Sequence, residues 1–131
     1  MESGNYLFVY GTLRSGVKNP ARHLLEKHAI LVDTGAFQGK LYDLGRYPGA
    51  VPSCGTRDRV IGEIYQLTDS RVTLEILDEY EGRHFKRKRV TIEKQHGQPV
   101  TAWIFLYVGT VKQQSRIHSG DYLRYRNSVL G

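Results

Sequence analysis

The chain has 131 residues, which suffices for one domain with a hydrophobic core and is too short for two domains of ordinary size. Its 19 Lys and Arg residues against 13 Asp and Glu residues give a formal net charge of +6. The positive charges are dispersed, and the densest run, residues 86–89, would alternate between the two faces of a strand. Nucleic acid is therefore a disfavoured partner.

The composition also limits the compartment and the kind of chemistry. The single cysteine, Cys54, excludes an intramolecular disulfide, and no nucleophile motif surrounds it. No apolar run is long enough to span a membrane, and the first residues do not have the pattern of a signal peptide. We therefore expect a cytoplasmic protein without a membrane partner. The spacing of His and Cys residues indicates no metal site.

Residues 7–10 are aromatic, aliphatic and β-branched, which predicts a buried first strand. Gly11 ends this strand and allows backbone conformations that a side chain would forbid. The loop that follows would expose backbone N–H groups, which can bind a carboxylate or a polarised carbonyl. The alternation of Phe8 and Tyr10 directs the Tyr10 hydroxyl toward such a ligand. Alternatively, the stretch is only the first core strand and its turn.

The rest of the chain favours a β-rich fold with few helices, because Val, Ile, Tyr and Phe recur in short runs between glycines. A short helix is predicted from Pro20 to about Lys27, and a longer one over 72–80, ended by Gly82. Strands are predicted over 36–44, 60–67, 85–93 and 100–108, with a turn at 46–49 and a hairpin at 96–99. An amphipathic turn or helix is expected over 119–125.

The helix predicted over 72–80 places one carboxylate in an unusual position. On a helical wheel its apolar residues form one continuous arc, made by Val72, Leu74, Ile76, Leu77 and Tyr80. Glu81 falls within this arc, whereas Glu75 and Glu79 fall outside it. Burial and the helix dipole would both raise the pKa of Glu81, as a general base near neutral pH requires. Alternatively, the helix frays and Glu81 reaches water or pairs with Arg83 or Arg87.

With both features in hand, the chain resembles the γ-glutamylcyclotransferase-like superfamily. That family has a Tyr-Gly-(Thr/Ser)-Leu loop after its first strand and a glutamate that closes a Leu-Asp-x-x-Glu helix end. Here the loop is residues 10–13 and the glutamate is Glu81. Residues 85–87, 103–107 and 120–122 match further parts of the family pattern. The resemblance covers nearly the whole chain, and the two main motifs are specific in this order and spacing.

The resemblance implies one α+β domain over residues 1–131: a small mixed β-barrel with flanking short helices and a pocket at its mouth. It implies conversion of a small γ-glutamyl amine or γ-glutamyl amino acid to 5-oxoproline and free amine, with no cofactor or metal. It assigns the acid–base chemistry to Glu81. It assigns substrate binding to the loop and to an aromatic residue of a late strand: Tyr10, Gly11, Thr12, Leu13 and Tyr107.

Several alternatives stay open at this point. Phe85 stands where the family often has tyrosine, and either Phe105 or Tyr107 could face the pocket. A non-catalytic member that binds a small amino-acid-like ligand would carry the same motifs, since a fold can be shared where an activity is not. A small basic barrel that binds nucleic acid would need basic and stacking residues gathered on one face. The leaving amine and the oligomeric state are not predicted.

Overall fold

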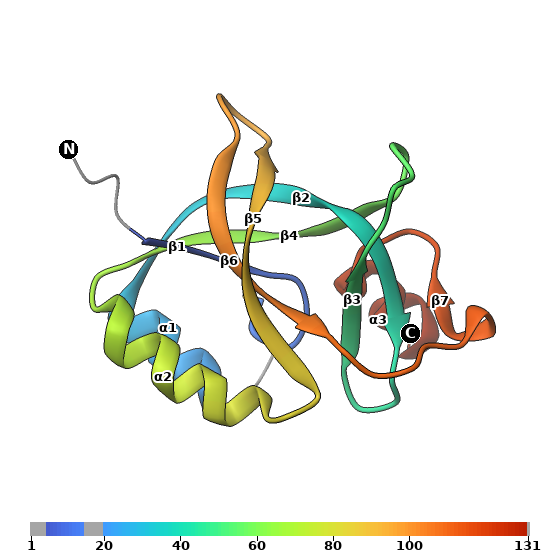
Figure 1. The fold of residues 1–131 in the computed structure, drawn as a ribbon, viewed down its shortest axis with the longest axis horizontal. Coiled ribbons are helices and arrows are strands. Elements are labelled where there is room, and N and C mark those ends of the chain that lie inside the picture. Colours follow the sequence, from blue (N-terminus) through green and yellow to red (C-terminus); the bar gives the residue numbers. More distant parts are fainter. Residues whose placement is uncertain (1–4, 15–19, 131) are drawn as a thin grey trace.

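The structure, a computed structural model, describes residues 5–14 and 20–130. Five strands close into a barrel, because β2 pairs with β5 as well as with β4 (Figure 1). In order around the barrel they are β2 (Ala29–Asp43), β4 (Arg59–Leu67), β1 (Asn5–Val9), β6 (Val100–Tyr107) and β5 (Phe85–Lys94). The β1–β6 pair is parallel and the other pairs are antiparallel. The predicted mixed β-barrel is therefore confirmed.

The second half of β2 leaves the barrel and carries a small extension of the sheet. On it pair β3 (Pro48–Pro52) and β7 (Arg116–Ile117), the latter preceded by the 3₁₀ turn η1 (Gln113–Ser115). The turn predicted at 46–49 is displaced toward the N-terminus. The Leu44 N–H bonds the carbonyl of Tyr47 at 3.0 Å, and Pro48, the first residue of β3, already pairs with Asp43 of β2. Proline lacks an N–H donor but can begin an edge strand such as this one.

Two of the predicted elements are longer in the structure than local patterns indicate. Strand β2 begins at Ala29 and not at residue 36, with a bulge between Leu31 and Asp33. Its first half was missed because Ile30, Leu31 and Val32 form an unbroken apolar run that is nevertheless exposed. At the other end of the chain, the segment expected over 119–125 is helix α3 (Tyr122–Leu130).

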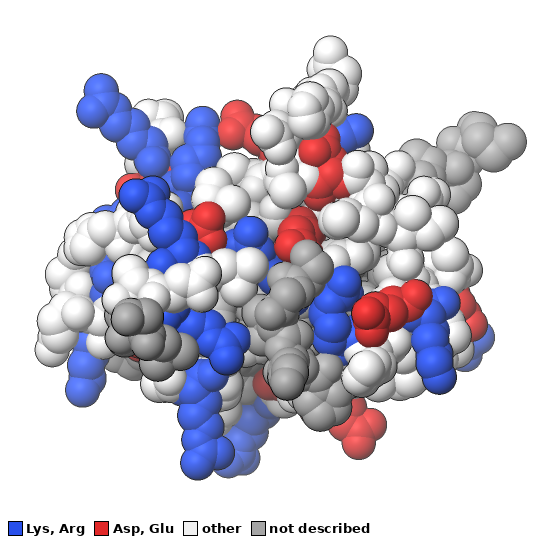
Figure 2. Space-filling model, turned by 180° about the vertical axis from the view of Figure 1, so that it is seen from behind, with Lys and Arg blue, Asp and Glu red and all other residues white. Residues whose placement is uncertain are grey.

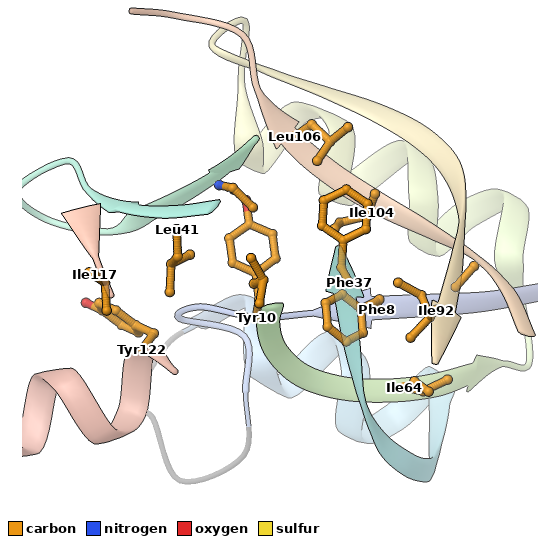
Figure 3. Close-up of a cluster of buried hydrophobic side chains, with 13 residues drawn as sticks. Phe8, Tyr10, Phe37, Leu41, Ile64, Ile92, Ile104, Leu106, Ile117 and Tyr122 are labelled. Carbon is orange, nitrogen blue, oxygen red and sulfur yellow. The ribbon is translucent and has the colours of Figure 1, made fainter. Parts of the chain in front are cut away.

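The hydrophobic core has two parts. One fills the barrel and continues beyond it, from Phe8 and Ile92 past Tyr10 to Tyr122 of α3 (Figure 3). The other lies between the barrel and the helices α1 (Pro20–His28) and α2 (Ser70–Glu81), which pack on each other at one end of the molecule (Figure 1). Its fully buried members include Leu25 and Leu77. Helices α1 and α2 therefore cover one side of the barrel, and α3 lies at the opposite end.

The buried face of α2 differs from the predicted apolar arc. Thr73, Leu74 and Leu77 are buried, whereas Val72, Ile76 and Tyr80 of the arc are each 46% exposed. The wheel could not separate two adjacent apolar stripes, and packing on α1 and β5 selected only one of them. Glu81 lies one turn after Leu77 and therefore stays on the buried side.

Candidate active site

A cavity of about 290 Å³ opens where the end of β1 meets the end of α2. The loop that follows β1 contributes residues 10–13, and α2 contributes Tyr80 and Glu81. The turn before β3 adds Tyr47 and Pro48, and the strands β5 and β6 add Phe85 and Phe105. The two stretches singled out in the sequence, far apart along the chain, therefore line one cavity.

Glu81 is the last residue of α2 and the one carboxylate that the described part of the chain contributes to the cavity wall. The helix does not fray before it, because the Gly82 N–H bonds the carbonyl of Asp78 at 3.1 Å. Burial raises the pKa of Glu81 from its ordinary 4.5 to about 7. No described cation forms an ion pair with Glu81. A carboxyl group with such a pKa can both accept and donate a proton near neutral pH.

Of the two arginines considered as partners of Glu81, Arg83 is exposed and Arg87 is bonded to another residue. Arg87 makes two hydrogen bonds to the carboxylate of Asp78, at 2.8 and 3.0 Å. Its guanidinium also lies over the ring of Trp103, 4.3 Å from the centroid. Arg87 is therefore held against the outside of α2 and does not pair with Glu81.

The loop after β1 is closed by a backbone hydrogen bond from the Arg14 N–H to the Gly11 carbonyl, at 3.1 Å. Gly11 does not have a positive φ, so the expected reason for glycine here is wrong. The reason is space: a Cβ atom at Gly11 would lie 2.7 Å from Cγ of Pro48. The N–H groups of Gly11, Thr12 and Leu13 donate no backbone hydrogen bond to another described residue of a turn or loop. They are the backbone donors at this wall of the cavity.

The structure places the Tyr10 side chain differently from the expectation. Its ring lines the cavity, but its hydroxyl donates to the Phe105 carbonyl at 2.6 Å and accepts from the Ala50 N–H at 3.1 Å. Burial raises the pKa of Tyr10 far above its ordinary value, and the nearby Glu81 carboxylate adds to the increase. The hydroxyl is thus used by the fold and is not directed at a ligand.

The structure shows which of two aromatic residues of β6, Phe105 or Tyr107, faces the cavity. Phe105 lines the cavity, whereas Tyr107 does not. Tyr107 packs edge-on against Phe85, with ring centroids 5.5 Å apart, and Phe85 packs in the same way against Tyr47 at 5.7 Å. Of these two residues of β6, Phe105 therefore lies in the cavity wall, and Tyr107, predicted to bind substrate, lies behind Phe85 outside that wall.

Two features of the site carry no local signal in the sequence. Tyr47 and Pro48 were assigned only to a turn, and their place at the cavity depends on the β2–β3 pairing. Arg14 is 7% exposed, donates to Asp121 at 2.9 Å and lies 3.7 Å from a carboxylate oxygen of Glu63. It ties the end of the cavity loop to β4 and to the start of α3. Only long-range contacts reveal these roles.

Other kinds of site receive no support from the described residues 5–14 and 20–130. Within these ranges no group of three or more His, Cys, Asp and Glu side chains could hold a metal ion. No helix there is long and apolar enough to cross a membrane. Lys and Arg are spread over the face seen in Figure 2, with Asp and Glu between them.

Comparison with known proteins agrees with this geometry. Residues 7–124 match the family described as gamma-glutamyl cyclotransferase, AIG2-like. A relative from Vibrio cholerae is 42% identical over 120 residues, which cover 88% of this chain and 93% of the relative. The gamma-glutamylcyclotransferase family protein YtfP of Escherichia coli K12 is 37% identical over 117 residues, covering 89% of this chain and 95% of its own length.

Solved structures share the fold. The solution structure of E. coli ytfP has a TM-score of 0.64 and 31% identity, and the match covers 92% of this chain and 98% of that one. The crystal structure of a mouse AIG2-like protein has a TM-score of 0.72 at 23% identity, over 90% of this chain and 87% of that one. On the family match, the relatives and the fold together, the chain belongs to the gamma-glutamyl cyclotransferase, AIG2-like family.

Proposed function

We propose that this protein converts a small γ-glutamyl amine or γ-glutamyl amino acid to 5-oxoproline and a free amine, with Glu81 as the general base and acid. The observation that carries the proposal is the state of Glu81. It lines the same cavity as the loop of residues 10–13, burial raises its pKa to about 7, and no described cation neutralises it. Membership of the family supports the class of reaction.

The proposed reaction is an intramolecular attack, so the protein needs to fold the substrate and move protons. The α-amino group of the substrate, with a pKa near ~8, is mostly ammonium at neutral pH and cannot attack. Glu81 accepts its proton, and the amine nitrogen then forms a bond to the γ-carbonyl carbon. The attacking nitrogen still carries two hydrogens, and one of them passes to water as a proton. Glu81 returns the first proton to the leaving nitrogen as the bond between that nitrogen and the carbon breaks and the carbonyl re-forms. Such a group contributes on the order of 10² to 10⁴ in rate.

The remaining walls of the cavity suit the other parts of the substrate. The N–H groups of Gly11, Thr12 and Leu13 can bind the α-carboxylate or the oxyanion that develops on the carbonyl. Phe85 and Phe105 offer apolar surface to the methylene groups of the folded glutamyl chain. The described part of the cavity wall contains no Lys or Arg, so anion binding depends on the backbone.

The experiment is release of 5-oxoproline from a panel of γ-glutamyl amines, γ-glutamyl amino acids and glutathione. We expect turnover of at least one small γ-glutamyl compound by the wild type and its loss in Glu81→Gln, which should still bind. Glu79→Gln, two residues away and exposed, is the matched control and should retain turnover. Full activity of the Glu81 variant would exclude the base role. Binding without turnover by the wild type would make the protein a non-catalytic, ligand-binding member.

A further inference from the structure

The last turn of α2 is joined to β5 by a pair of charged residues that lie just outside the cavity. Nε and a terminal nitrogen of Arg87 bond the two carboxylate oxygens of Asp78, at 2.8 and 3.0 Å. The face of the same guanidinium lies 4.3 Å from the centroid of the Trp103 ring. A two-point ion pair and a ring contact together fix the orientation of this side chain.

This pair lies near Glu81 along α2 and beside the cavity wall along β5. On α2, Asp78 precedes Glu81 by three residues, and such neighbours have Cβ atoms about 5–6 Å apart. On β5, Arg87 follows Phe85 by two residues and is therefore directed to the same face of the strand. Phe85 lines the cavity, and so does Phe105, the residue opposite Arg87 on β6. Arg87 is thus a cation beside the cavity that does not line it.

We propose that Asp78 and Arg87 are positioning residues for Glu81: their pair fixes the last turn of α2 against β5 and holds the guanidinium outside the cavity, so that Glu81 has no cationic partner. The inference rests on the proposed function, in which Glu81 moves protons. It explains why the arginine of β5 that lies beside the cavity wall is bonded to Asp78 and not to the acid–base carboxylate.

The other ionisable groups on the elements around Glu81 are tyrosines, are bonded to other residues or are exposed, so the Asp78–Arg87 pair is the candidate for this positioning role. Among the residues that line the cavity, the ionisable ones besides Glu81 are Tyr10, Tyr47 and Tyr80. Among the other elements near Glu81, the loop after β1 carries Arg14, bonded to Asp121, and the turn after α2 carries the exposed Arg83 and His84. Helix α1 packs on α2 through buried Leu25, with Arg22 over the Tyr65 ring and with Glu26, Lys27 and His23 exposed.

The expected effects of the two partners have opposite signs. An opposite charge within about 4–6 Å lowers the pKa of a carboxyl group, and a like charge raises it. Asp78→Asn removes a negative charge and frees Arg87 to approach Glu81, so the pKa of Glu81 should fall. Arg87→Met leaves the Asp78 carboxylate unpaired, so the pKa of Glu81 should rise. A purely structural contact would not produce opposite shifts.

The test is a titration of the ¹³C-labelled side-chain carboxyl groups of the full chain by NMR, with Glu81 assigned from Glu81→Gln. We expect shifts of roughly 0.5–1 pH unit, downward in Asp78→Asn and upward in Arg87→Met. The variant with both substitutions should return to within a few tenths of wild type, because it restores neutrality. Glu75→Gln, which removes the exposed partner of Arg71 on the same helix, is the control and should not shift Glu81.

The pH profile of kcat/KM gives a second readout, since its acid limb should move with the titration of Glu81. Unshifted titrations in both single variants, or shifts in the same direction, would overturn the proposal. Lower turnover with an acid limb at the wild-type pH would mean that the pair is only a structural contact, and this result would also overturn the proposal. Absence of turnover in every protein, wild type included, would refute the proposed function alone, because the NMR titration needs no substrate.

Discussion

The hydroxyl of Tyr10 donates a hydrogen bond to the carbonyl oxygen of Phe105 at 2.6 Å, and the Ala50 N–H donates to the same hydroxyl at 3.1 Å. One side chain thereby joins the start of the cavity loop to β6 and to β3. The residue is 6% exposed, so water does not replace these bonds easily. The position of the cavity loop therefore depends on a tyrosine hydroxyl that no ligand needs to touch.

Tyr10→Phe should lower the free energy of unfolding by about 1–3 kcal/mol, because a buried N–H and a buried carbonyl each lose a partner. Its effect on KM should be small, since the ring that lines the cavity is retained. Urea unfolding and substrate titration measure the two quantities. Tyr47→Phe is the control, because Tyr47 is 39% exposed and its loss of a hydroxyl should change stability little. If stability is unchanged and binding is weaker, the Tyr10 hydroxyl contacts the ligand, as expected from the sequence.

Glu81→Gln should change how stability depends on pH. In the wild type the folded state raises the pKa of this carboxyl from 4.5 to about 7, so folding favours the protonated form. This contribution is fully present below about pH 4.5 and is lost as the pH rises through about 7. The loss should amount to roughly 1–3 kcal/mol, and glutamine, which does not ionise, avoids it.

The measurement is chemical unfolding of wild type and variant at about pH 5 and about pH 8. The difference in stability between Glu81→Gln and wild type should shift in favour of the variant at the higher pH. Glu79→Gln serves as the control, because that side chain is exposed and should show no such change. A variant that parallels the wild type at both pH values would mean that Glu81 is not desolvated.

The pH dependence of turnover should show the ionisation of Glu81. Glu81 acts as a base only when deprotonated, so kcat/KM should fall about tenfold for each pH unit below about 7. The rate of wild type on its best γ-glutamyl substrate, measured from about pH 5 to about pH 9, gives this limb. A limb near the ordinary carboxyl value of 4.5 would contradict the raised pKa.

Much of the fold follows from local patterns in the sequence. The strand before Tyr10, the helix that ends at Gly82 and the hairpin of β5 and β6 are each marked by periodicity and by a glycine or proline at the boundary. The first half of β2 is not, because its partner β4 lies far along the chain, and β3 is not, because it is short and has proline at both ends. Pairing between strands that are distant in sequence is a property that a local window does not contain.

The residues of the site likewise include some that local sequence predicts and others that only the tertiary structure places. Glu81 and the loop of residues 10–13 can be found from the sequence. Glu81 is a carboxylate within the apolar arc of a helix, and the loop contains a glycine that ends an apolar strand. The bonds of Tyr10, the place of Tyr47 and the choice of Phe105 over Tyr107 depend on how distant segments meet. The orientation of α2 also needed the tertiary structure, because two apolar stripes run along one helix.

Leu77→Ala and Ile76→Ala test that orientation on adjacent residues of α2. Leu77 is fully buried, so its truncation should cost about 2–5 kcal/mol through lost transfer energy and a cavity. Ile76 is 46% exposed, and its truncation should cost under about 1 kcal/mol. Urea unfolding of both variants gives the comparison. Equal losses in the free energy of unfolding would mean that Ile76 is as buried as Leu77, as the apolar arc on the helical wheel predicts.

Gly11→Ala tests whether the cavity loop depends on close packing with Pro48. The added Cβ would lie 2.7 Å from Cγ of the proline ring, which cannot rotate away because Pro48 of β3 pairs with Asp43 of β2. The loop should therefore move, with a cost of about 1–3 kcal/mol in stability. A displacement of about 1 Å in substrate-positioning groups can lower turnover by about 10².

The second variant that makes this test specific is Gly11→Ala combined with Pro48→Ala. Truncating the ring removes the Cγ and Cδ atoms that the new methyl group meets at 2.7 and 3.1 Å. The double variant should therefore recover kcat/KM relative to Gly11→Ala, and the two stability losses should sum to more than the measured loss of the double variant. Because Gly11 has no positive φ, alanine can adopt its backbone conformation, and the rescue is not limited by strain. Strictly additive losses with no recovery of turnover would show that the methyl group acts on the ligand directly and not through Pro48.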